Sequence, residues 1–288
     1  MTDADENKLA LLMDFENIAM GAKRAQYKDF DVHLVLRRLL DKGKIVVKRA
    51  YADWERYSDY KRVFHESAIE LIDIPQKHYS GKNSADIKLV VDALELCYVK
   101  EHIDTFVIAS GDSDFSPLVS KLKENNKYVI GVGVKNSTSD LLIDNCDEFI
   151  FYEDLVRPPQ QPPAAAIKST LPKKKQQAFA LLLDAIVSLK RENKEMLWAS
   201  MIKESIKRKM PQFDEGYFDF VTFSELLEDA AAHKLVQLRK DQKSGSYIVT
   251  AFAKRRTTPA APEEGEAEEK KPAARPVARP VARARSAR

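Results

Sequence analysis

The chain has 288 residues, 44% of them hydrophobic, which allows two domains and at least one hydrophobic core. No run approaches the roughly 18 unbroken apolar residues of a membrane span, and the acidic start MTDADENKLALLMDF is unlike a signal peptide, so no membrane partner is expected. The net charge of +3 conceals an asymmetry, because residues 1–156 hold 21 Lys and Arg against 28 Asp and Glu, whereas residues 157–288 hold 26 against 16. A basic half joined to an acidic half predicts a polyanionic partner that one half binds and the other processes.

Short strand-like runs alternate with helical patterns between residues 8 and 155. The strand-like runs are LALLMDF (9–15), KIVVKRAYA (44–52), IELIDIP (69–75), IDTFVIAS (103–110), KYVIGVGV (127–134) and DEFIFY (147–152). The helical patterns are DVHLVLRRLLDKG (31–43), RYSDYKRVFHESA (56–68), SADIKLVVDALELCYV (84–99) and DFSPLVSKLKENN (114–126). In the third of these helices, the apolar stripe of an amphipathic helix is formed by Ile87, Val90, Val91, Leu94 and Cys97. The alternation predicts an α/β fold with a doubly wound, mostly parallel sheet covered on both faces.

A change of composition separates this part from the rest of the chain. Residues 157–172, RPPQQPPAAAIKSTLP, are rich in Pro, Ala and Gln and are interpreted as a semi-rigid linker. Helical patterns follow at 174–193, 197–210 and 220–235, and then two strand-like runs around a Lys-Ser-Gly turn within 236–252. Three helices and a hairpin in about 80 residues favour a winged helix-turn-helix.

The last segment, residues 253–288, lacks the apolar residues of a core and is predicted to be a disordered charged tail. Its Arg-Pro-Ala run PVARPVARARSAR is equally consistent with a solubilising role and with contact to nucleic acid.

Carboxylates are expected to meet at one end of the predicted sheet. Asp14 lies at the end of the first strand, and Asp112 and Asp114 follow the fourth strand. If the strand order is 3-2-1-4-5, an order assumed from the fold class, these two strands are neighbours where the order reverses. Asp14 then faces Asp112 and Asp114 across a crevice at the carboxyl ends of the strands.

Asp86 is expected to join them from the first turn of the helix at 84–99, with Ser84 as the N-cap. For Asp86 alone, a favourable interaction with the helix dipole explains the position, and for Asp114 alone, capping of the helix near Phe115 does so. A cap explains one acid but not several that converge, since like charges repel unless a cation neutralises them. The spacing therefore favours metal-dependent phosphodiester chemistry over caps, with Mg²⁺ or Mn²⁺ preferred by all-oxygen ligands.

Other side chains near these acids have two interpretations each. Asn17, which follows Glu16 after Asp14, is a candidate to position substrate or a metal-bound water, or is a turn residue. Lys82 is a candidate phosphate contact or a solvated lysine, and Asp140 either reaches the crevice or begins a helix. The five histidines form no triad with a nucleophile, and no phosphate-cradling glycine motif appears, which disfavours nucleotide-fuelled chemistry.

Four segments in this order resemble the NYN domain family, and its LabA-like branch most closely. They are LLMDFEN, KNSADIKLVVDAL, IASGDSDFSPLVSKLKENNKYVIGVGV and SDLLIDNCDEFIFYEDL, and the resemblance covers nearly all of residues 8–155. It implies a PIN-like α/β fold, an acidic Mg²⁺/Mn²⁺ site, and the ribonuclease activity of studied members. Asp14 matches the family's first-strand aspartate and Asp86 its helix aspartate. Asp112 and Asp114 match its Gly-Asp-x-Asp pair.

A second resemblance covers about residues 173–252. The segment IKRKMPQFDEGYFDFVTFSELLEDAAAHKLVQL is similar to the OST-HTH (LOTUS) domain, which implies a winged helix that binds RNA and sometimes docks a protein partner. A basic face before Pro211 is formed by Lys203, Lys207, Arg208 and Lys209. Lys207 and Arg208 are the candidate phosphate contacts, and a solvated helix face is the alternative. Most of the aromatic residues at 213–223 are predicted to be core.

Together these patterns predict a metal-dependent endoribonuclease that acts on single-stranded or structured RNA. Residues 1–156 form its nuclease domain and 173–252 its RNA-capturing domain, with Asp14, Asp86, Asp112 and Asp114 as catalytic metal ligands. A non-catalytic RNA-binding or regulatory adaptor is the alternative, and DNA cleavage or binding is a third. Cys97 and Cys146 lie in apolar surroundings without metal-ligand spacing, which predicts buried thiols in a reduced, cytoplasmic protein.

Overall fold

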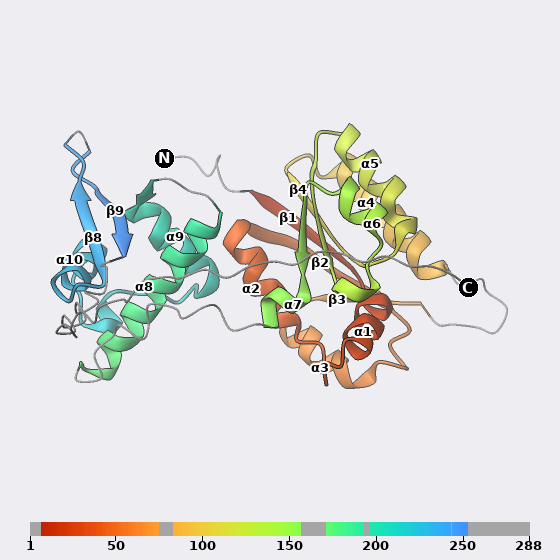
Figure 1. The fold of residues 1–288 in the computed structure, drawn as a ribbon, viewed down its shortest axis with the longest axis horizontal. Coiled ribbons are helices and arrows are strands. Elements are labelled where there is room, and N and C mark those ends of the chain that lie inside the picture. The colour runs from red at the N-terminus through yellow and green to blue at the C-terminus, as the bar shows by residue number, and fades with distance from the viewer. Residues whose placement is uncertain (1–6, 75–82, 157–170, 193–195, 243, 253–288) are drawn as a thin grey trace, which may run out of the picture. The chain divides into compact units, whose positions relative to one another are not determined.

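The computed structural model describes residues 7–74, 83–156, 171–192, 196–242 and 244–252 (Figure 1). All of these described residues belong to one compact unit. The predicted tail, most of the predicted linker and Lys82 lie outside the described residues. We call residues 7–156 the α/β region and residues 171–252 the C-terminal region, because each has its own sheet and its own hydrophobic clusters.

The α/β region is built on a six-stranded sheet in which every pairing is parallel. In chain order its strands are β1 (Lys8–Asp14), β2 (Lys44–Ala52), β3 (Glu70–Asp73), β4 (Thr105–Ala109), β5 (Tyr128–Gly133) and β6 (Glu148–Phe151). In space the order is β3-β2-β1-β4-β5-β6. This confirms the assumed neighbourhood of the first and fourth strands, with Leu9 paired to Thr105 and Met13 to Ala109. The strand order therefore reverses between β1 and β4, where α/β sheets commonly bind ligands.

Helices cover both faces of this sheet. The helices are α1 (Phe15–Arg24), α2 (Val32–Lys42), α3 (Ser58–Glu66), α4 (Ser84–Val99), α5 (Ser116–Glu124), α6 (Asp140–Asn145) and α7 (Tyr152–Val156), with short 3-10 turns η1 (Ser113–Phe115) and η2 (Lys135–Ser137). Alternate residues of β1 enter two different clusters: Leu9, Leu11 and Met13 pack with α1, α2 and α3, whereas Ala10 and Leu12 pack with α4, α5 and α6. The pattern did not predict α1, which begins directly at the end of β1.

The buried face of α4 differs from the predicted stripe. Its buried side chains are Leu89, Asp92, Ala93, Leu96 and Cys97. Ile87 and Val91, which the stripe included, are 64% and 53% exposed. The stripe is right for Cys97 and for the partly buried Val90 and Leu94, which pack against the core, but it is wrong for Ile87 and Val91. The buried face also includes a carboxylate, that of Asp92. Ion pairs and a hydrogen bond satisfy that carboxylate, which apolar spacing cannot reveal.

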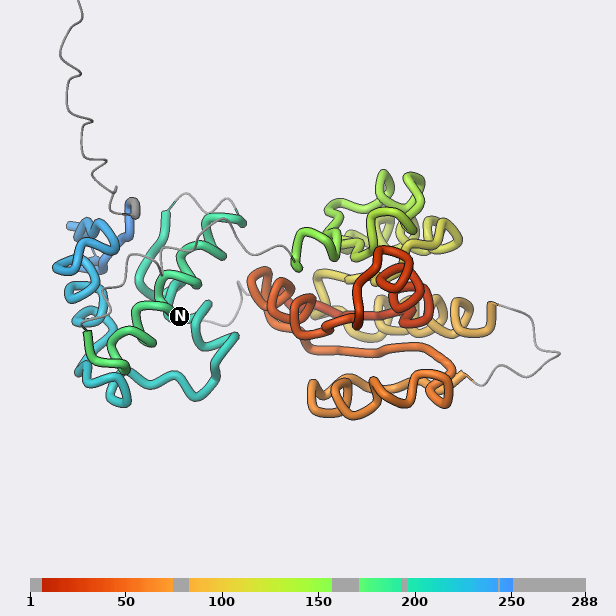
Figure 2. The backbone as a smooth tube through the Cα atoms, turned by 60° about the horizontal axis from the view of Figure 1, so that its bottom comes forward, coloured from red at the N-terminus to blue at the C-terminus, as the bar shows by residue number. Residues whose placement is uncertain are grey.

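The C-terminal region consists of three helices and a small antiparallel sheet (Figure 2, green to blue). Its elements are α8 (Lys173–Arg191), β7 (Leu197–Trp198), α9 (Ala199–Lys209), η4 (Gly216–Phe218), α10 (Phe223–Ala232), β8 (Val236–Lys240) and β9 (Tyr247–Phe252), with strand order β7-β9-β8. Leu197 and Trp198, predicted to begin a helix, instead pair with β9. Phe213, Phe218, Phe220 and Phe223 are buried as predicted, whereas Tyr217 is 60% exposed.

Candidate active site

Asp14 is the last residue of β1 and also the N-cap of α1. One carboxylate oxygen accepts a hydrogen bond from the backbone N–H of Asn17 at 3.2 Å, and the other accepts one from the Ser110 hydroxyl at 3.0 Å. Burial is the main cause that raises the pKa of Asp14 to about 7, and the charge of Asp86 raises it further against these hydrogen bonds. Asp14 therefore changes its charge near neutral pH.

The segment Gly111–Asp114 follows β4 and turns sharply into η1. The backbone N–H of Asp112 donates to Ser110 Oγ at 3.2 Å, and that of Asp114 donates to Asp112 Oδ1 at 3.0 Å. Asp112 is thus the N-cap of η1, while α5 begins only at Ser116. The interpretation of Asp114 as the cap is wrong, because the helix begins one short turn earlier than the apolar spacing predicts. Asp112 is half-buried and Asp114 is exposed.

Gly111 lies where two backbone segments meet. Its carbonyl accepts a hydrogen bond from the Ser139 N–H at 2.9 Å, and a Cβ at this position would lie 2.3 Å from the carbonyl oxygen of Ser137. A glycine is therefore needed for the close approach. Ser139 in turn caps α6 through the Leu141 N–H, and Asp140 is exposed in the first turn of that helix. Asp140 thus occupies the helix N-terminal position that sequence reasoning offered as one of its two interpretations.

Asp86 lies half-buried in the first turn of α4, as predicted. The N-cap is Asn83 rather than Ser84, and it makes no side-chain capping bond. Burial raises the pKa of Asp86, and the charges of Asp112, Asp114 and Glu16 raise it further. Asp86 therefore lies within electrostatic reach of Asp14 and of both acids of the Gly-Asp-Ser-Asp pair.

Glu16 is a fifth acid of this cluster that was given no role from the sequence. One of its carboxylate oxygens accepts a hydrogen bond from the Asp53 N–H at 2.9 Å, and the other lies 4.0 Å from Arg56 Nη1. The charge of Glu16 also raises the pKa of both Asp14 and Asp86. Asp53 directly follows β2, so the signal available in the sequence was its position at the carboxyl end of a second strand beside β1.

Residues 8–153 match the profile of the NYN domain. The chain belongs to the NYN domain family. It is 31% identical over 150 residues to an uncharacterized protein of Methanocaldococcus jannaschii, and the match covers 50% of this chain and 55% of the relative, so the chain spans about half the length of that curated relative. A crystal structure of a protein of unknown function from Vibrio parahaemolyticus is 26% identical with a TM-score of 0.48, and the match covers 54% of this chain and 98% of that one.

The NYN family includes nucleases, and nucleases of this PIN-like kind generally depend on a divalent metal. The candidate site in this NYN domain offers carboxylate oxygens, the ligands that Mg²⁺ and Mn²⁺ prefer. The raised pKa values of Asp14 and Asp86 reflect burial and repulsion by neighbouring acids, which a bound cation relieves. Across the described ranges, however, no three His, Cys, Asp or Glu side chains form a group that could hold a metal ion. Carboxylates are thus suitable ligands for Mg²⁺ or Mn²⁺, but an ion could bind only if these side chains moved closer together.

The remaining predicted site residues are placed differently. The side chain of Asn17 accepts a hydrogen bond from the Gly111 N–H at 2.8 Å, so it joins the start of α1 to the segment after β4. Lys207 is exposed and Arg208 half-buried on α9 in the C-terminal region. Cys97 is buried and Cys146 half-buried, both as free thiols. Within the part of the chain that the structure describes, no helix has the length and apolar character needed to cross a membrane.

Proposed function

We propose that this protein is a ribonuclease that hydrolyses RNA phosphodiester bonds at the carboxyl end of its NYN sheet. The observation that carries the proposal is the position of Asp86 within electrostatic reach of Asp14, Asp112 and Asp114, at the end of the sheet where β1 and β4 end. A bound cation stabilises the charged form of a carboxylate whose charge is disfavoured by burial and by neighbouring acids. Membership of a family that includes nucleases supports the reaction class.

In this proposal Mg²⁺ or Mn²⁺ would be held by Asp14, Asp86, Asp112 and Asp114, and when bound it supplies charge neutralisation and an activated water for attack on phosphorus. The chain's own groups position these ligands. Ser110 and the Asn17 N–H orient the two oxygens of Asp14, and the Asn17 side chain fixes the start of the segment that carries Asp112. Asp112 is itself oriented by the Asp114 N–H.

We further propose that residues 173–252 form a LOTUS-type winged helix that captures RNA, joined by a linker at 157–172 and followed by a tail at 253–288. The element order α8-β7-α9-α10-β8-β9 supports a winged helix. The exposed face of α10 carries Glu225 and Glu228, which repel phosphates, whereas α9 ends in Lys207, Arg208 and Lys209. RNA contact is therefore assigned to α9.

A non-catalytic RNA-binding adaptor is the second candidate. It is favoured by one observation, the lack of a closed group of three metal-binding side chains among the described residues. In that case the acids would serve only as N-caps and as partners of backbone N–H groups, as Asp14 and Asp112 already do.

The deciding experiment is cleavage of labelled single-stranded and structured RNA by the purified chain with Mn²⁺, with Mg²⁺, and with a chelator. Asp112→Asn should keep the fold, because asparagine is also a good N-cap, and should lower the cleavage rate by about 100-fold or more, since a ligand is lost. The matched control is Asp144→Asn, which removes an exposed acid of α6 and should leave the rate unchanged. Full activity of Asp112→Asn would refute the assigned site. A wild-type chain that binds these RNAs but cleaves none of them would favour the adaptor.

A further inference from the structure

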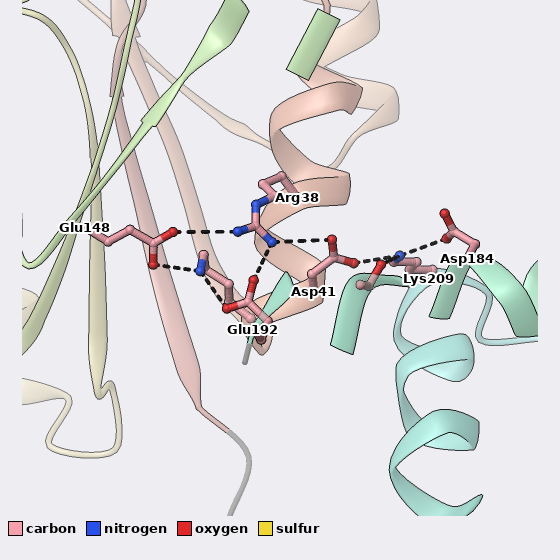
Figure 3. A network of polar contacts seen from close by, with 8 residues as sticks. Arg38, Asp41, Glu148, Asp184, Glu192 and Lys209 are labelled. Carbon is pink, nitrogen blue, oxygen red and sulfur yellow. Dashed lines mark hydrogen bonds and ion pairs between the residues drawn. The ribbon is translucent and has the colours of Figure 1, made fainter. Parts of the chain in front are cut away.

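Charged side chains at the end of α2 form ion pairs with the C-terminal region (Figure 3). We call this set the α2 ion-pair network. Its members are Arg38, Asp41 and Lys42 of α2, Glu148 of β6, Asp184 and Ser188 of α8, Glu192 at the C-cap of α8, and Lys209 of α9. The network joins two helices of the C-terminal region to one helix of the NYN domain.

Two cations lie at the centre of the network. Lys42 Nζ lies 2.7 Å from both Glu148 and Glu192, and Arg38 also pairs with Glu192. Lys209 Nζ lies 2.6 Å from Asp41, 2.9 Å from Asp184 and 2.8 Å from the Ser188 hydroxyl. The side chains of Lys42 and Lys209 are only 9% and 12% exposed, so these pairs are shielded from solvent more than ordinary surface pairs.

Glu192 depends on the NYN domain for its stabilisation. A carboxylate at a helix C-terminus is unfavourable, because it meets the negative end of the helix dipole. Burial also disfavours its charge, yet the hydrogen bond from Lys42 and the charge of Arg38 outweigh these effects and hold the pKa of Glu192 below its ordinary value. The favourable partners of Glu192 thus come from α2.

The network lies at the opposite end of the sheet from the candidate active site. Lys42 ends α2 just before β2 begins, and Glu148 is the first residue of β6. Both therefore mark the amino ends of parallel strands, whereas Asp14 and Asp112 follow the carboxyl ends of β1 and β4. The network also engages Lys209, one of the basic residues at the end of α9 to which RNA contact is assigned.

We propose that the α2 ion-pair network holds the C-terminal region in a docked state that RNA opens, because Asp41 and an RNA phosphate compete for Lys209. This inference rests on the proposed capture of RNA by α9. Asp41, Asp184 and Glu192 surround the docked end of α9 and α8 with negative charge, which repels a polyanion. RNA therefore binds the undocked state more tightly, and the fraction of docked chain lowers its apparent affinity.

The test is zero-length crosslinking of the full chain with a carbodiimide, which joins only lysine and carboxylate groups in contact, followed by peptide mass spectrometry. Free protein at low salt should give the amides Lys42–Glu192 and Lys209–Asp41. Saturating single-stranded oligouridylate should reduce both, while the Lys42–Glu148 amide, formed within the NYN domain, should persist as the internal control. RNA that binds in the same samples but leaves Lys42–Glu192 unchanged would overturn the inference and leave the proposed function intact.

A variant gives the second measurement. The double variant Asp41→Asn, Glu192→Gln should bind the same RNA about three- to tenfold more tightly than wild type, since it populates the undocked state. Glu70→Gln, which breaks the 2.8 Å pair with Arg49 inside the NYN domain, is the control and should leave the RNA affinity unchanged. Equal affinity of the double variant and wild type would contradict the inference. If neither wild type nor the double variant binds RNA, although wild type forms both crosslinks, the proposed RNA capture and its competition with Asp41 are both refuted.

Discussion

Asn17 and Gly111 are 94 residues apart in the chain, yet the side-chain oxygen of Asn17 accepts a hydrogen bond from the Gly111 N–H at 2.8 Å. This bond joins the start of α1 to the segment that carries Asp112, across the boundary between β1 and β4. The bond therefore links the α1 start, next to Asp14, to the segment that carries Asp112 without the help of a bound ion.

Replacing Asn17 by alanine should lower the free energy of unfolding by about 1–3 kcal/mol, because the half-buried Gly111 N–H loses its acceptor. RNA cleavage should fall as well, since the segment with Asp112 is no longer held against Asp14. Urea unfolding and the cleavage assay measure the two effects. Asn125→Ala is the control, because the half-buried Asn125 donates to the Lys121 carbonyl and to the Tyr98 hydroxyl and to no residue of the site. A variant at Asn17 that cleaves RNA as fast as wild type would contradict the positioning role.

The close approach at Gly111 leads to a second prediction. In Gly111→Ala the new Cβ would lie 2.3 Å from the Ser137 carbonyl oxygen, so the backbone on one side must move. We expect a loss of about 1–3 kcal/mol in stability, as for other overpacked sites. Gly216→Ala is the control, because there the Cβ would meet only the flexible carboxylate of Asp214, at 3.0 Å. Thermal unfolding of both variants tests the difference, and equal melting temperatures would refute it.

The pKa of Asp14 predicts a specific dependence of stability on pH. The folded chain holds this proton up to about pH 7, whereas an ordinary aspartate loses it near 3.8. Its contribution to stability is therefore complete below about pH 3.8 and is lost as the pH rises through 7, by up to about 4 kcal/mol at 1.36 kcal/mol per pKa unit. Asp14→Asn should lack this decline and should be more stable than wild type at pH 8 in the absence of metal.

Urea titrations of wild type and Asp14→Asn between pH 4 and 8 measure this difference. Added Mn²⁺ should restore stability to wild type at pH 8 but much less to the variant, because a cation replaces the proton. Parallel curves for the two proteins would contradict the raised pKa. A raised pKa without an effect of Mn²⁺ would favour the adaptor over the nuclease.

The buried carboxylate of Asp92 gives a prediction about stability alone. Tyr51 donates to Asp92 Oδ2 at 2.8 Å, while Lys88 contacts the other oxygen at 2.7 Å. Tyr51→Phe should cost about 1–3 kcal/mol, since a buried acceptor loses a neutral donor, and should leave RNA cleavage unchanged. Tyr98→Phe, at an exposed position of α4, the helix that carries Asp92, should lower the stability much less. A large loss of activity in Tyr51→Phe would show that this pair also acts on the site.

Sequence reasoning located the strands because they follow from local patterns, whereas the expected meeting of the acids also needed a strand order assumed from the fold class. Apolar runs of strand length ended at Asp14 and before Asp112, and the rule for parallel sheets placed those ends together, as the pairing of Met13 with Ala109 confirms. The prediction failed where a side chain's surroundings depend on distant residues. The buried Asp92, for example, is satisfied partly by residues of β2, Tyr51 and Arg49, which lie more than 40 residues away in the chain.

Dependence on distant residues also explains why the roles of Glu16 and Lys209 were not predicted. Glu16 was noticed but given no role, because its partners Asp53 and Arg56 follow a different strand. Lys209 fitted a solvent-facing basic stripe by spacing, yet it pairs with Asp41 of α2, a partner that no pattern within α9 could indicate. Spacing identifies which residues share a face, but not which distant residues that face contacts.

Asp14 ends β1 and caps α1, so the carboxylate that faces the other acids is also the acceptor for the Asn17 N–H. A cation bound at Asp14 therefore alters the hydrogen bond to the Asn17 amide and the rate of local unfolding at the start of α1. The Asn17 amide resonance and its hydrogen exchange become an intrinsic gauge of cation occupancy. Both signals can be measured in a variant that is unable to cleave RNA, so the affinity of the site for a cation can be determined separately from the cleavage rate.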